Sequence, residues 1–102
     1  MSVLMTLRVR GNAQALEERA AGNPAGMQAI LAKAIPHGLI SHSFYASGDE
    51  VMVVDEWESE EGFQRFFAEA TEIPAMMAEV GVTSEPEVTF WRKLETHDDH
   101  PA

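Results

Sequence analysis

The hairpin segment at residues 39–58 constrains the fold of this 102-residue chain more than any other segment. Two largely apolar arms flank a turn at residues 47–49, which is the pattern of a β-hairpin. Side chains alternate between the two faces of a strand, so Phe44 and Tyr45 must point in opposite directions, and "VMVV" at 51–54 is apolar on both faces. Both faces of this hairpin therefore need a cover.

The first half of the chain contains a predicted strand followed by two helical stretches. Residues 2–10 alternate between apolar and polar and predict a strand with one buried face. Asn12 and Asn23 are suited to begin helices, and we expect helical stretches at residues 13–21 and 24–35.

After the hairpin we expect two further helical stretches and a last strand. Ser59 is a predicted cap for a helix at residues 60–70, and Thr71 for a further helical stretch that Gly81 ends. Residues 88–94 predict the last strand.

The order strand, helix, strand, strand, helix, strand predicts an α+β, ferredoxin-like βαββαβ fold with a four-stranded antiparallel sheet. We expect a single domain over residues 2–94 and a polar, disordered tail over residues 95–102. The helices would cover one sheet face only, yet Phe90 and Trp91 again point in opposite directions. The apolar residues on the uncovered face would be buried by a second copy of the chain, so the sequence predicts a homodimer.

The charge and cysteine content exclude several classes of function. The formal net charge is −10, with 17 acidic against 7 basic residues, which argues against nucleic-acid binding and against anionic membranes. The absence of cysteine excludes disulfides and thiolate metal sites. With no signal peptide and no apolar run near the ~20 residues that span a bilayer, we expect a cytoplasmic protein.

A polar pair lies inside the apolar hairpin. With a two-residue turn, His42 lies opposite Asp55 and Ile40 lies opposite Trp57, and a slip by two residues would keep the same faces. The imidazole could donate to the carboxylate, which would make His42 and Asp55 candidate catalytic residues, with His42 as general base. The alternative is a structural pair at a dimer contact or sheet edge, because buried polar groups need partners.

Aromatic residues near this pair are the candidate ligand pocket, and plain core packing is the alternative. No metal site is predicted: the acidic run at residues 55–61 lacks spaced His or Cys ligands, and the histidines of the tail are poorly fixed. The sequence has no glycine-rich phosphate loop and no nucleophile elbow. The candidate pocket residues are Trp57, Phe63, Phe66 and Phe67.

The element order, "GLISH" at 38–42 and "VMVVDEWESEEGFQRFF" at 51–67 resemble the antibiotic-biosynthesis-monooxygenase-like dimeric α/β-barrel superfamily over residues 2–94. The resemblance implies two ferredoxin-like units that pair their sheets into a barrel, with a pocket in each subunit between sheet and helices. It implies an activity like that of small cofactor-independent monooxygenases on an apolar or aromatic ligand. The alternative is a dimer that binds a ligand or a partner without chemistry.

Haem-degrading members of the superfamily carry an axial histidine on the helix after the third strand. The resemblance places that histidine ten residues beyond Trp57, where this chain has Phe67, and it places Thr6 where those enzymes have an asparagine. We therefore expect no haem chemistry and no cofactor.

Overall fold

The computed structural model describes residues 2–101 and contains the predicted order of elements. The four strands are β1 (Val3–Arg10), β2 (Leu39–Ser47), β3 (Glu50–Trp57) and β4 (Glu87–Trp91). The helices are α1 (Ala13–Gly22), α2 (Pro24–Ala34), α3 (Glu60–Glu69) and α4 (Glu72–Glu79), with a 3₁₀ turn, η1 (Ile35–His37), between α2 and β2.

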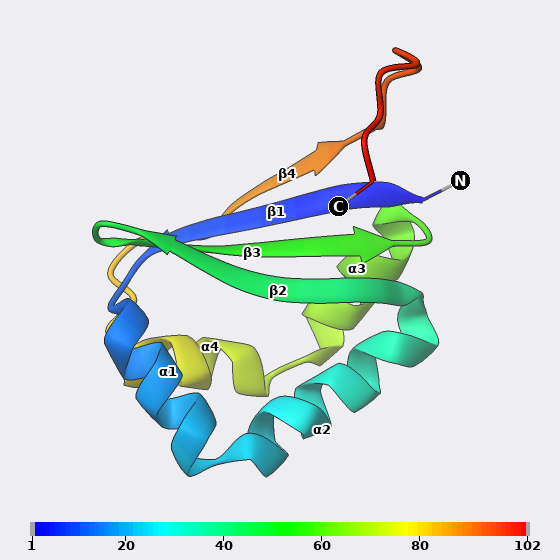
Figure 1. Ribbon diagram of the computed structural model, residues 1–102. Helices are drawn as coiled ribbons and strands as arrows, with labels where there is room; N and C mark the ends of the chain where they lie inside the picture. Colours follow the sequence, from blue (N-terminus) through cyan, green and yellow to red (C-terminus); the bar gives the residue numbers. More distant parts are fainter. Residues whose placement is uncertain (1, 102) are drawn as a thin grey trace.

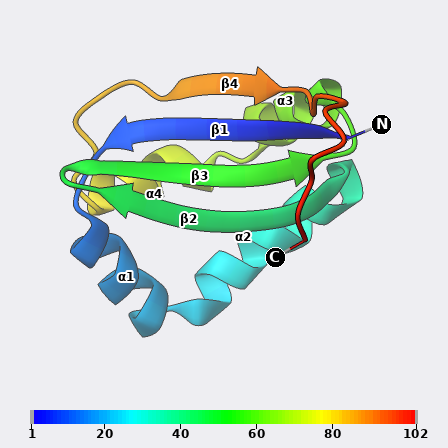
Figure 2. The same cartoon turned by 45° about the horizontal axis from the view of Figure 1, so that its top comes forward.

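The strands form one antiparallel sheet in the order β2-β3-β1-β4. All four helices lie on one side of this sheet (Figure 1), and the rotated view in Figure 2 shows its other face free of helices. The predicted ferredoxin-like fold is therefore confirmed. No helix within residues 2–101 is both long and apolar enough to cross a bilayer.

Side-chain caps begin three of the helices, as predicted. The side-chain oxygen of Asn12 accepts from the backbone of α1 at 3.0 Å, and those of Asn23 and Ser59 accept from α2 and α3, each at 3.1 Å. These bonds satisfy backbone N–H groups that a helix start leaves unpaired. Thr71 occupies the cap position of α4 but makes no side-chain bond to it, so that part of the prediction is wrong. Gly81, with φ of +76°, ends the α4 segment in the left-handed conformation.

The last strand is shorter than predicted. It ends at Trp91 instead of Leu94, because Trp91 pairs with Leu4 and β1 extends only one residue further, to Val3. Residues 92–101 form neither helix nor strand, and Ala102, the end of the expected tail, lies outside the described residues. Within this segment a hydrogen bond to Asp99, at 2.8 Å, raises the pKa of Lys93.

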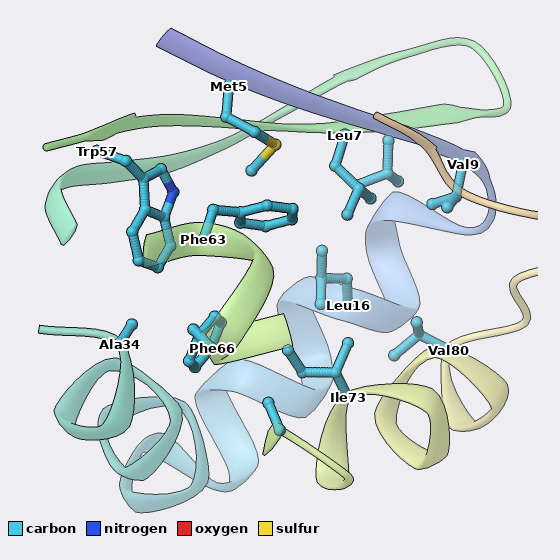
Figure 3. Packing of buried hydrophobic residues seen from close by; sticks show 12 residues of the cluster. Met5, Leu7, Val9, Leu16, Ala34, Trp57, Phe63, Phe66, Ile73 and Val80 are labelled. Atoms are coloured by element: carbon cyan, nitrogen blue, oxygen red, sulfur yellow. The ribbon is translucent and has the colours of Figure 1, made fainter. Parts of the chain in front are cut away.

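The core lies between the sheet and the helices. Met5, Leu7 and Val9 point from β1 toward the helices, and Leu16 and Phe66 meet them from the helix layer (Figure 3). These inward-facing residues are those that the strand alternation and the helical spacing select.

One glycine sets the distance between α3 and η1. A Cβ atom added to Gly62 would lie only 2.1 Å from the carbonyl oxygen of His37. Real Cβ atoms do not approach an oxygen this closely, so α3 can rest directly on the η1 backbone only with glycine at this position.

Candidate functional site

A cavity of about 300 Å³ lies between the sheet and the helix layer. Its wall is almost entirely apolar, and β1, β2, β3 and all four helices contribute to it. Some of its lining side chains are half-buried, among them Leu39, His42 and Phe44 of β2.

His42 and Asp55 both line this cavity on the helix-facing side of the sheet. Nδ1 of His42 lies 2.7 Å from Oδ1 of Asp55. The indole N–H of Trp57 donates to Oδ2 of the same carboxylate at 3.1 Å. The side chain of Asp55 is 7% exposed and that of His42 is 25% exposed, so the carboxylate is enclosed while the imidazole is partly accessible.

The hydrogen bond to Asp55 determines where neutral His42 carries its proton. An ionised carboxylate only accepts hydrogen bonds, so Nδ1 must be the protonated nitrogen, and Nε2 keeps its lone pair. Nε2 makes no hydrogen bond to any side chain or backbone group of residues 2–101. The imidazole is therefore equipped to accept a proton from a molecule in the cavity.

The predicted hairpin register is confirmed for His42 opposite Asp55 and is wrong for Ile40 opposite Trp57. A register shift between Leu39 and Ser41 places Leu39 opposite Trp57 and leaves Ile40 as an unpaired bulge residue. A bulge inserts one extra residue into one strand of a pair. As a result Leu39 packs against the core, whereas Ile40 is 52% exposed.

An aromatic wall faces the pair from α3. Phe63 and Phe66 lie with ring centroids 5.5 and 5.6 Å from Trp57, and Phe67 stacks on Phe63 at 5.3 Å. Figure 3 shows Trp57, Phe63 and Phe66 gathered at one end of the core. All four predicted pocket residues line the cavity.

Phe44 is a cavity residue that was not among the predicted site residues. Its ring meets His42 edge-on, with centroids 4.9 Å apart and an interplanar angle of 85°. The spacing of two residues from His42 along the same strand was the available signal, because such residues share a face.

No family model matches the sequence, and no curated protein matches it either. Solved structures do match. A monooxygenase of Streptomyces coelicolor in complex with nanaomycin D is 20% identical, with a TM-score of 0.62 over 99% of this chain and 91% of that chain. A dimeric ferredoxin-like protein from an uncultured marine organism is 14% identical, with a TM-score of 0.61 over 97% and 93%.

A third match is a cofactor-independent oxygenase of Streptomyces nogalater, 16% identical, with a TM-score of 0.53 over 96% of this chain and 98% of that chain. The chain has the fold of the antibiotic-biosynthesis-monooxygenase-like proteins. At these identities the likeness establishes the fold alone.

Haem ligation from position 67 does not fit this cavity. Phe67 occupies the position expected for an axial histidine, and its ring is stacked on Phe63 in the cavity wall. A phenyl ring offers no atom that could bind iron. Within residues 2–101 no group of three or more His, Asp or Glu side chains is arranged to hold a metal ion.

Proposed function

We propose that the cavity binds a flat, apolar molecule with a weakly acidic C–H or O–H group, and that His42 removes this proton as a general base. The observation that carries the proposal is the free Nε2 of a cavity-lining imidazole whose Nδ1 is bonded to Asp55 at 2.7 Å. Asp55 stabilises the imidazolium that forms and keeps the ring in the reactive tautomer, as a carboxylate does behind a catalytic histidine. The apolar wall suits a neutral aromatic molecule.

The chemistry we propose is a cofactor-independent monooxygenation. His42 takes a proton from a CH₂ group of the substrate, and the carbanion reduces O₂ and bonds to it as a peroxide. The peroxide takes up the proton from His42 to become a hydroperoxide. Loss of the second C–H proton with cleavage of the O–O bond then gives a carbonyl and water, so that CH₂ + O₂ becomes C=O + H₂O. Because the substrate carbanion supplies the electrons, no cofactor is required.

We also propose that the protein is a homodimer joined through the outer sheet face. The exposed apolar residues there include Leu4, Tyr45 and Trp91, which are 42%, 58% and 52% exposed. The indole N–H of Trp91 donates to the Thr6 hydroxyl at 2.9 Å, which supports a ring lying across this face. An exposed apolar face of this kind is typical of a protein contact.

Anthrone, a flat apolar compound with an acidic CH₂ group, is a suitable probe of the reaction. We expect the protein to consume O₂ and to form the anthraquinone chromophore, with the carbonyl oxygen derived from ¹⁸O₂. His42→Ala should lower kcat about a hundredfold, the usual contribution of a general base. Asp55→Asn should lower it as well, because the amide cannot support the imidazolium in the same way.

Ser43→Ala is the matched control, because Ser43 follows His42 on β2 but faces away from the helices. An unchanged rate in His42→Ala would overturn the assignment of the base. If anthrone binds, as seen by quenching of tryptophan fluorescence, but is not oxidised by the wild-type protein, the result favours a ligand-binding dimer without catalysis.

A further inference from the structure

The carboxylate of Asp55 has a second partner besides His42. The Trp57 indole N–H bonds to Oδ2, the oxygen that His42 does not use, at 3.1 Å. Trp57 lies two residues after Asp55 on β3, so both side chains are on the helix-facing side of the sheet. Trp57 is 1% exposed, so this bond is shielded from competing water.

The indole ring is itself held in place. Phe63 and Phe66 of α3 contact it at centroid distances of 5.5 and 5.6 Å, with interplanar angles of 75° and 36°. The two rings restrict rotation of the indole. They come from α3, the helix that Ser59 caps. These contacts hold the ring from one side, and the bond to Oδ2 of Asp55 fixes the direction of the indole N–H.

The geometry points to Trp57 as a positioning residue for His42, acting through Asp55. With Oδ2 held by the indole, the carboxylate cannot turn about its axis, and Oδ1 stays directed at Nδ1 of the imidazole. His42 then keeps the tautomer whose Nε2 is free to accept a proton. This inference rests on the proposed function for its effect on rate, but not for its effect on the imidazole.

Trp57→Phe removes the N–H donor while retaining an aromatic ring. In the wild-type protein, ¹⁵N NMR should show neutral His42 protonated at Nδ1, with a slowly exchanging, downfield Nδ1–H proton. In Trp57→Phe we expect that proton signal to broaden or disappear and the two tautomers to mix. On anthrone, kcat should fall roughly tenfold, the worth of one hydrogen bond to a charged group, with KM little changed.

Phe66→Leu is the control for packing, because it loosens the aromatic cluster and leaves the indole N–H in the protein. Its Nδ1–H signal should persist even where its melting temperature falls. The inference is overturned if Trp57→Phe lowers the melting temperature but leaves the His42 tautomer and Nδ1–H signal as in wild type. It is equally overturned if Phe66→Leu abolishes the signal as completely as Trp57→Phe does.

The two ideas fail in different ways. If the wild-type protein does not oxidise anthrone but Trp57→Phe alters the tautomer of His42, the positioning role stands and the proposed reaction does not. If anthrone is oxidised and Trp57→Phe changes neither kcat nor the spectrum, the reaction stands and Trp57 is only part of the wall.

Discussion

Asp55 is a buried carboxylate inside an apolar sheet, and each of its oxygens accepts a hydrogen bond, one from His42 and one from Trp57. Burial of such a group is tolerated only when its hydrogen bonds are made. The same bonds leave one nitrogen of His42 free beside the cavity. At this site the requirement for stability and the proposed requirement for catalysis are met by one arrangement.

Replacing His42 by Ala should therefore reduce stability as well as activity. Oδ1 of Asp55 would lose its donor in a nearly closed environment, which we expect to lower the free energy of unfolding by roughly 1–3 kcal/mol. Urea denaturation followed by circular dichroism measures the change, and Ser43→Ala should give a change within about 0.5 kcal/mol. Equal stability of wild type and His42→Ala would show that the carboxylate does not depend on the imidazole.

Phe67 leads to a second expectation at the residue scale. Haem with reductant and O₂ should give no verdohaem or bilin product, because Phe67, at the position expected for the axial histidine, has no ligand atom. Formation of a bilin by the wild-type protein would contradict this reading of the cavity.

At the scale of the elements, α3 lies close to η1 because position 62 has no side chain. Gly62→Ala would push a methyl group against the His37 carbonyl, and relief of that clash must move α3 and its aromatic wall. We expect a loss of about 1–3 kcal/mol in the free energy of unfolding.

Gly22→Ala is the matched control, because nothing lies within 4 Å of the added Cβ atom and the residue ends α1. It should leave stability unchanged or raise it by about 0.4–1 kcal/mol through the unfolded chain. Thermal melts of both variants under the same conditions test the pair, and similar melting temperatures would mean that α3 shifts without cost.

The sequence predicts the elements well where local chemistry decides them. Asn12, Asn23 and Ser59 begin helices because their side chains replace missing backbone partners, and a two-residue turn fixes most of the hairpin register. The bulge at Ile40 was not predictable in this way. Leu39 and Ile40 are equally suited to a strand, and packing against the helices decides which one faces the core.

The cavity was also beyond the reach of sequence patterns. An apolar stripe that fills a core and one that lines a hollow use the same residues at the same spacing, so "FQRFF" at 63–67 is compatible with either. Helix placement decides the volume, and that placement depends on contacts such as Gly62 against η1. The pairing of His42 with Asp55 was accessible, because register alone brings them together.

At the scale of the whole molecule, the proposed dimer predicts the mass in solution. Sedimentation at micromolar concentration should give about twice 11.2 kDa. Trp91→Asp should dissociate the dimer or unfold it, since the face would then bury an unpaired charge. Gln64→Asp adds the same charge on exposed α3 and should leave the mass unchanged. A stable wild-type monomer at this concentration would contradict the proposal.

The bulge at Ile40 has a consequence for how copies of this chain meet. Strand β2 is an outer strand of the sheet, and a long flat outer strand is a template for fibrous aggregation. The bulge breaks the regular ladder at one end of β2, and the opposite border, β4, is only five residues long. Both borders are thus poor seeds for endless strand addition, so the proposed contact through the sheet face would be self-limiting.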